Sequence, residues 1–98
     1  MTLVSLAASD VAAALLLLQP DQRIDALFTD IYLKSEVFGG CHLARHARSL
    51  RPNLPVLYTT GNAVNADLTA MFVEGSMLLR KPYTQEQLGD AVDRLFAA

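Results

Sequence analysis

The sequence predicts an α/β fold in which a parallel sheet of about four short strands is covered by helices. Apolar segments of strand length alternate with helical patterns along the chain, which is typical of parallel sheets. Three of the four strand segments also end in a chemically useful side chain. The expected strands cover residues 2–6, 24–31, 54–61 and 77–80, and the expected helices cover residues 11–19, 40–51, 65–74 and 84–96.

Length and composition limit both the fold and the function. Ninety-eight residues make one small domain, residues 1–98, and 52% hydrophobic residues are enough to build a core. The formal net charge of -2, with acids and bases interspersed, argues against nucleic acid as a direct partner. The single cysteine, Cys41, excludes an internal disulfide and fits a cytoplasmic protein.

The apolar segment 3–18 is expected to belong to the core and not to a membrane. No positive charge precedes it, Asp10 interrupts it, and it is too short to span a bilayer. Within it, the four leucines at 15–18 place apolar side chains nearly all round the expected helix. Such a helix is normally covered on more than one side, either by a partner or by a neighbouring loop.

The strand expected at 24–31 holds the residue around which the chain is arranged. Its apolar run, residues 26–28, reads as a strand buried on both faces and stops at Asp30. Thr60 and Lys81 end the next two strands, and the carboxyl ends of parallel strands are where α/β proteins bind ligands. The three side chains are therefore expected at one edge of the sheet. The plainer alternatives are a turn or helix-cap role for Asp30 and an exposed strand-end charge for Lys81.

Two other patterns lie on the expected helices. His42 and His46 are four residues apart, a spacing that allows metal binding, but no third ligand is near in sequence and a solvated helix surface is the favoured interpretation. The segment 84–87 has the pattern of a capping box that starts the final helix. The expected buried face of the helix at 40–51 consists of Leu43, Ala44, Ala47 and Leu50.

Four short motifs in this order resemble the receiver domains of two-component response regulators. The spacings of thirty residues from Asp30 to Thr60 and of twenty-one from Thr60 to Lys81 are similar to those of the family, and the resemblance covers nearly the whole chain. It implies a flavodoxin-like three-layer sandwich. The motifs are Phe28-Thr29-Asp30-Ile31, Gly40-Cys41-His42-Leu43-Ala44, Leu54-Pro55-Val56 leading to Thr60-Gly61, and Lys81-Pro82-Tyr83.

The resemblance also implies a function. Asp30 would accept a phosphoryl group from a histidine kinase or a phosphotransfer protein, while Thr60 and Lys81 would each bind a phosphoryl oxygen. Mg²⁺ would be held by Asp30 and by the main-chain oxygen of Tyr32. The Lys81-Pro82 peptide bond would be cis. Such a domain signals through contacts with a downstream protein and is not an enzyme beyond its own phosphorylation and dephosphorylation.

The chain departs from the family at its N-terminus. Receivers begin with a central strand that ends in an acidic pair, followed by a helix, whereas residues 2–19 resemble the family's second strand and second helix. Without the acidic pair the Mg²⁺ site is expected to be weak. Leu78 also replaces a frequent aromatic residue. The chain is therefore either an N-terminally truncated form of a longer receiver or a degenerate, phosphate-independent interaction module.

A missing central strand would also change the sheet. The family's strand order is 2-1-3-4-5, so the segments 2–6 and 24–31 would have to pair directly or leave an open edge. A missing helix would uncover apolar surface beside the final helix. We therefore expect a homodimer that buries this surface together with the leucines at 15–18.

Overall fold

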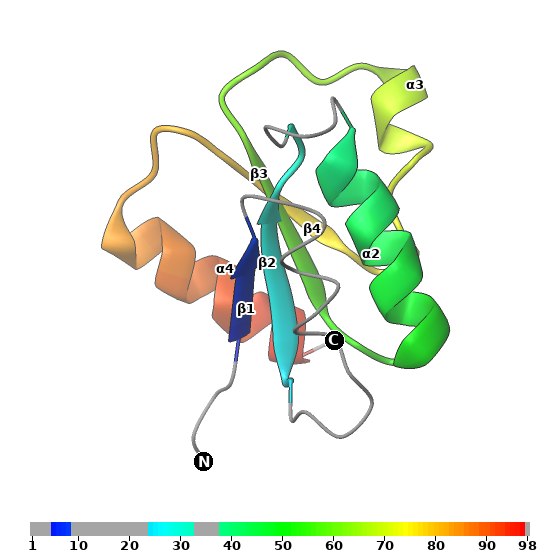
Figure 1. The fold of residues 1–98 in the computed structure, drawn as a ribbon. Coiled ribbons are helices and arrows are strands. Elements are labelled where there is room, and N and C mark those ends of the chain that lie inside the picture. The colour runs from blue at the N-terminus through cyan, green and yellow to red at the C-terminus, as the bar shows by residue number, and fades with distance from the viewer. Residues whose placement is uncertain (1–4, 9–23, 33–37, 98) are drawn as a thin grey trace.

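Four parallel strands form a single sheet, in the order β1-β2-β3-β4 (Figure 1). This computed structural model describes residues 5–8, 24–32 and 38–97, and of residues 5–8 it describes the backbone alone. The strands are β1 (Ser5–Ala8), β2 (Ala26–Asp30), β3 (Val56–Thr60) and β4 (Met77–Arg80). The helices are α2 (Gly39–Leu50), α3 (Ala66–Thr69) and α4 (Gln85–Ala97).

The sheet is continuous, with no strand inserted between β1 and β2. β1 pairs directly with β2, with Leu6 opposite Leu27, and β2 pairs in turn with β3. This is the direct pairing expected for a sheet that lacks the family's first strand. Because β2 has a strand on each side, its backbone groups are satisfied within the sheet, and its carboxyl end lies between two other strand ends.

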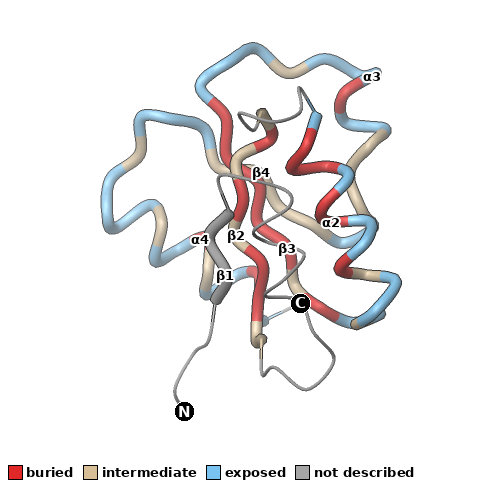
Figure 2. Tube along the Cα trace, in the orientation of Figure 1, coloured by how far each residue is buried: buried red, intermediate tan, exposed pale blue. Residues whose placement is uncertain are grey.

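The sheet is the middle layer of three, because α2 and α4 lie on opposite sides of it (Figure 1). Side chains alternate between the faces of a strand, so neighbours in sequence enter different cores. Tyr58 packs in the core on the α2 side, whereas Leu57 packs against Ala91 and Leu95 of α4. β3 is buried along its whole length, as Figure 2 shows. The predicted three-layer α/β architecture is confirmed.

One expected core residue of α2 is exposed. Leu43, Ala44 and Ala47 are fully buried as predicted, but the prediction for Leu50 is wrong, since 43% of its surface is exposed. Leu50 is the last residue of the helix, and the core beyond the helix end is filled by Leu54, which returns toward the sheet. Cys41 completes the buried face of the helix.

The first strand and the helix expected at 65–74 differ most from the elements that were predicted. The first strand is β1 at 5–8, so residues 7 and 8, which lay outside the expected strand at 2–6, also pair with β2. The helix expected at 65–74 is reduced to α3, whose four residues are capped by the side chain of Asn65. The segment that follows is held by tertiary contacts instead: Phe72 stacks on Tyr58, whose hydroxyl accepts a hydrogen bond from the main-chain N–H of Val73.

The final helix begins as its sequence predicted. The main-chain N–H of Gln87 donates to the hydroxyl of Thr84, and the main-chain N–H of Thr84 donates to the side-chain oxygen of Gln87, which is a reciprocal capping box. The helix expected at 11–19 lies outside the described residues. None of the helices in the described ranges has the length and apolar content that a bilayer crossing requires.

A glycine allows α2 to begin against the end of β2. The main-chain N–H of Gly40 donates to the carbonyl oxygen of Ile31 at 2.9 Å. A Cβ atom on Gly40 would lie 1.9 Å from the carbonyl oxygen of Asp30, far inside van der Waals contact. The helix therefore approaches the strand end this closely only because residue 40 has no side chain.

Gly40→Ala should consequently destabilise the protein strongly. Since the clashing atom belongs to the backbone, the helix start or the strand end must move, and we expect the free energy of unfolding to fall by about 3 kcal/mol or more. Gly89→Ala is the matched control: it lies within α4 with nothing near its Cβ position, so it should raise stability by about 0.5 to 1 kcal/mol. Urea denaturation of both variants measures the difference, and equal stabilities would contradict the close approach.

Candidate functional site

The three side chains that the sequence singled out lie at the carboxyl edge of the sheet. The ammonium Nζ of Lys81 lies 2.8 Å from Oδ1 of Asp30, an ion pair that joins the ends of β2 and β4 across β3. Thr60, at the end of β3, lines the same small pocket of about 130 Å³. The remaining residues that line this pocket are Tyr32, Thr59, Gly61 and Asn62.

Main-chain hydrogen bonds hold these strand ends in place. The N–H of Ile31 donates to the carbonyl oxygen of Thr59, and the N–H of Lys81 donates to the carbonyl oxygen of Thr60, each at 2.9 Å. The backbone pairing therefore continues one residue beyond β2 and β4. It reaches Ile31, which follows Asp30, and Lys81, which carries the ammonium group. The Lys81-Pro82 peptide bond is cis, as the family resemblance implied.

Asp30 contacts a threonine that the sequence analysis missed. The hydroxyl of Thr59 donates a hydrogen bond of 2.5 Å to Oδ1 of Asp30. These two residues are direct partners in the register between β2 and β3, so their side chains lie on the same face of the sheet. Thr60 follows on the opposite face, and its hydroxyl accepts a hydrogen bond from the main-chain N–H of Asn62. The sequence alone does not show which of the two adjacent threonines faces Asp30, because this depends on the register between β2 and β3.

The environment of Asp30 favours its charged form. Burial raises the pKa of this carboxyl group, but hydrogen bonds from Lys81 and Thr59, together with the charge of Lys81, outweigh that effect and hold the pKa below its ordinary value. Both members of the ion pair are partly open to solvent, with 45% of the Lys81 side chain and 40% of the Asp30 side chain exposed. Asp30 is therefore an ionised, accessible carboxylate at neutral pH.

The oxygens at this edge give a divalent cation an incomplete set of ligands. Oδ1 of Asp30 is contacted by Lys81 and by Thr59, and the expected ligands are the carboxylate of Asp30 and the main-chain oxygen of Tyr32. Within the described ranges no group of three or more His, Cys, Asp or Glu side chains converges as a metal site. Mg²⁺ accepts one carboxylate when water and phosphate oxygens fill its other positions, so these residues fit a weak site.

The other candidate residues do not join this site. His42 and His46 are both exposed on α2, as the favoured interpretation of their spacing predicted. Cys41 is fully buried in the core on the α2 side, and burial raises the pKa of its thiol. A buried thiol of raised pKa is a poor nucleophile, so Cys41 is a packing residue.

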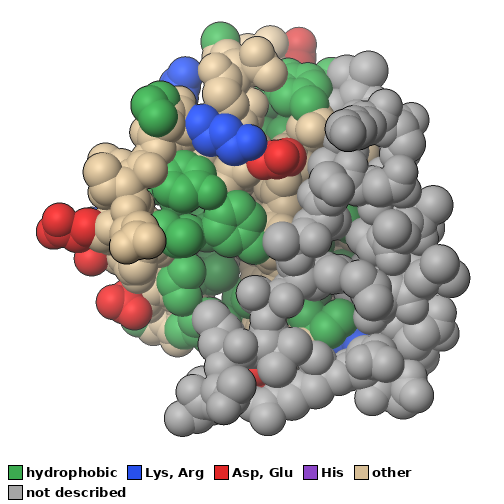
Figure 3. All heavy atoms as spheres, turned by 60° about the vertical axis from the view of Figure 1, so that its left-hand side comes forward, with side chains coloured by type: hydrophobic (Ala, Val, Ile, Leu, Met, Phe, Trp, Pro, Cys, Tyr) green, Lys and Arg blue, Asp and Glu red, His purple; other side chains and the backbone are tan. Residues whose placement is uncertain are grey.

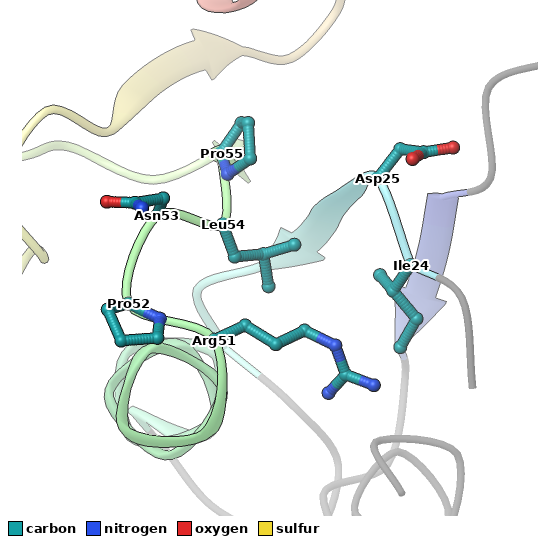
Figure 4. A pocket seen from close by; sticks show the side chains of 7 residues that line it. All are labelled: Ile24, Asp25, Arg51, Pro52, Asn53, Leu54 and Pro55. Carbon is teal, nitrogen blue, oxygen red and sulfur yellow. The ribbon is translucent and has the colours of Figure 1, made fainter. Parts of the chain in front are cut away.

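A larger cavity of about 400 Å³ lies at the opposite end of the strands (Figure 4). The residues that line it come from the start of β2 and from the turn between α2 and β3, and the side chain of Arg51 extends from this turn toward Ile24 (Figure 4). It therefore lies at the amino ends of the strands, away from the carboxylate and ammonium pair. The residues that line it are Ile24, Asp25, Arg51, Pro52, Asn53, Leu54 and Pro55.

Solved structures provide the comparison with known proteins, since no protein-family model and no curated protein matches the sequence. The chain is similar to a response regulator receiver protein from Sinorhizobium medicae WSM419, with a TM-score of 0.81 and 35% identity over 95% of this chain and 73% of that one. It also shares its fold with the receiver domain of the sensor histidine kinase PA1611 from Pseudomonas aeruginosa PAO1. That match has a TM-score of 0.73 and 22% identity over 93% and 75% of the two chains, and that protein carries magnesium in its active-site cleft.

Lys81→Met should raise the pKa of Asp30. The substitution removes a hydrogen bond and a positive charge that favour the carboxylate, while the burial that opposes the charge remains. Because the pKa is lowered in the folded state, Asp30 stabilises the fold above its ordinary pKa, and this contribution is lost as pH falls through the folded pKa. The variant should lose that pH dependence.

Carboxyl ¹³C NMR titration of Asp30 measures this pKa directly. Arg80→Met is the matched control, since Arg80 is the exposed neighbour of Lys81 and does not contribute to the pKa of Asp30. An unchanged pKa in Lys81→Met, or an equal rise in both variants, would show that the ion pair does not set the charge state.

Proposed function

Because the chain belongs to the receiver domains of two-component response regulators, we propose that Asp30 accepts a phosphoryl group from a histidine kinase or a phosphotransfer protein. The observation that supports this most directly is the ion pair between Asp30 and Lys81 beside a small open pocket. An ionised carboxylate next to a fixed ammonium group is suited to attack a phosphorus atom and to bind the charge that arrives with it.

The chemistry that we propose uses three side chains of this edge. A carboxylate oxygen of Asp30 forms a bond to phosphorus as the P–N bond of a phosphohistidine breaks, and the electron pair of that bond stays on the imidazole nitrogen. Lys81 supplies a compact positive charge with three N–H donors for the phosphoryl oxygens. Thr60, at the wall of the pocket, donates its hydroxyl to another phosphoryl oxygen in this proposal.

Mg²⁺ is part of the proposal as a weakly held cofactor. Asp30 and the main-chain oxygen of Tyr32 would hold it, with water completing its coordination. When bound, the ion neutralises charge on the transferring phosphoryl group. Tyr32 lines the same pocket as Asp30, which is consistent with this placement.

The output that we propose is a contact with another protein, made by residues 1–98 as a single domain in the cytoplasm. Phosphorylation would change the charge at the carboxyl edge of the sheet and so alter which protein surface binds there. The domain would catalyse nothing beyond its own phosphorylation and dephosphorylation.

A second candidate function is a phosphate-independent interaction module on the same fold. One observation favours it: among the described residues that line the pocket, no second carboxylate accompanies Asp30. In a domain that binds the cation poorly, the ion pair between Asp30 and Lys81 would have a structural role. Such a domain would bind its partner in the unphosphorylated state only.

Asp30→Asn separates these two candidates. With acetyl phosphate and Mg²⁺, the unmodified chain should gain the mass of one phosphoryl group as an acid-stable, alkali-labile acyl phosphate, and Asp30→Asn should gain none, because an amide is not a nucleophile here. Asp67→Asn, an exposed carboxylate in α3, is the control that should behave like the unmodified chain. If the unmodified chain gains no phosphoryl group, the phosphate-independent module is the correct function.

We also propose that the chain forms a homodimer through the α4 side of the sheet. Hydrophobic side chains gather on the side of the molecule that carries α4 (Figure 3), and an apolar pocket of about 200 Å³ lies between α4 and the sheet. Phe96 lines this pocket with 40% of its surface exposed. A second copy of α4, which is itself amphipathic, would cover this surface. The other residues that line the pocket are Ala26, Leu27, Phe28, Leu57, Leu88, Val92 and Leu95.

Sedimentation velocity at micromolar concentration tests this interface. The unmodified chain should sediment as a dimer, and Phe96→Glu should shift it toward the monomer because a charge would be buried in the apolar contact. Leu50→Glu is the matched control, since Leu50 is exposed to a similar extent, 43%, but lies on α2, on the opposite side of the sheet. A compact monomer for the unmodified chain would rule the dimer out.

A further inference from the structure

Two donors converge on one oxygen of Asp30. The ammonium group of Lys81 lies 2.8 Å from Oδ1, and the hydroxyl of Thr59 donates to the same Oδ1 at 2.5 Å. In the part of the chain that the structure describes, the carboxylate is therefore held asymmetrically: both donors contact Oδ1 and neither contacts Oδ2. The fold thus distinguishes two atoms that are chemically equivalent in a free carboxylate.

Thr59 is fully buried at the carboxyl end of β3. Its side chain points to the α4 side of the sheet, on the same face as Leu57, which packs against Ala91 and Leu95. A buried hydroxyl is costly unless it is hydrogen-bonded, and here the carboxylate of Asp30 is its acceptor. The strand register fixes this contact, because Thr59 and Asp30 are directly paired.

Building on the proposed phosphorylation of Asp30, we infer that Thr59 is a positioning residue that directs the phosphoryl group to Oδ2 and shortens the lifetime of the resulting acyl phosphate. Oδ1 then becomes the carbonyl oxygen of the acyl phosphate and remains in reach of the Thr59 hydroxyl. Before phosphorylation Lys81 also contacts Oδ1, but in the proposed reaction it binds the phosphoryl group as well. Thr59 is therefore the donor that contacts the carboxyl group alone.

The lifetime effect follows from how the charge on Asp30 changes during hydrolysis. The oxygen of a water molecule forms a bond to phosphorus, the P–Oδ2 bond breaks with its electron pair returning to the carboxylate, and both protons of the water leave with inorganic phosphate. In the loose transition state the carboxylate has regained most of its charge. A hydrogen bond to a charged acceptor is about twice as strong as one to a neutral carbonyl, so Thr59 stabilises this transition state more than the acyl phosphate.

Formation of the acyl phosphate should depend less on Thr59. The reactant is already a carboxylate with the full hydrogen bond, and the loose transition state retains nearly the same charge on Asp30. Ground state and transition state are then stabilised about equally, which leaves the rate unchanged. Removing the hydroxyl should therefore slow hydrolysis more than it slows phosphorylation.

The test compares Thr59→Val, which replaces the hydroxyl with a methyl group, and Thr59→Ser, which keeps it. Each 98-residue chain is phosphorylated with acetyl phosphate and Mg²⁺, separated from the phosphate donor, and followed by mass spectrometry as the acyl phosphate decays. We expect Thr59→Val to decay about five- to tenfold more slowly, with less than about a threefold change in the rate of formation. Thr59→Ser should restore the decay of the unmodified chain.

Thr29→Val is the matched control. Thr29 is also buried and next to Asp30, but its hydroxyl donates to the main-chain oxygen of Asp30 and not to the carboxylate, so its removal should leave the lifetime unchanged. Circular dichroism verifies that each variant is folded, and Thr59→Ala replaces Thr59→Val if the latter is not. An unchanged lifetime without the hydroxyl, or an equally long lifetime in Thr59→Ser, would overturn the role of Thr59. Failure of the unmodified chain to form the acyl phosphate would instead reject the proposed phosphorylation itself, and this inference with it.

Discussion

The parallel register between β2 and β3 is the constraint on which the site depends. It sets Asp30 opposite Thr59 and places both side chains on the α4 side of the sheet. A slip of one residue would turn every side chain of one strand to the other face, so Asp30 would lose Thr59 and the apolar residues of β2 would exchange cores. The packing of the two cores selects this register. It therefore also determines which side chains become neighbours at the strand ends.

The ion pair between Lys81 and Asp30 joins three strands into one functional edge. It links β4 to β2 across the end of β3, while main-chain hydrogen bonds from Ile31 and Lys81 to β3 keep the intervening backbone in place. Its contribution to stability is modest because both side chains are partly exposed. Its larger effect is on charge, since it keeps the carboxylate ionised and orients one of its oxygens.

The two sides of the sheet are covered unequally by the described residues. On one side α2 and the segment after β3 enclose a core that includes Tyr58 and its stacked partner Phe72. On the other side α4 packs against the sheet and leaves an apolar pocket beside Phe96. The direct pairing of β1 with β2 makes the sheet continuous up to this edge. The homodimer that we propose would use this surface.

The sequence by itself determined the element order, the α/β class and the strand-end positions of Asp30, Thr60 and Lys81, because alternating apolar segments and terminal polar residues are local patterns. The capping box at Thr84 is local for the same reason. Only the tertiary structure decided that Thr59 contacts Asp30, that Leu50 is exposed, and that packing against Tyr58 replaces most of an expected helix. Each of these depends on which residues become neighbours across strands or beyond a helix end, and no local pattern carries that information.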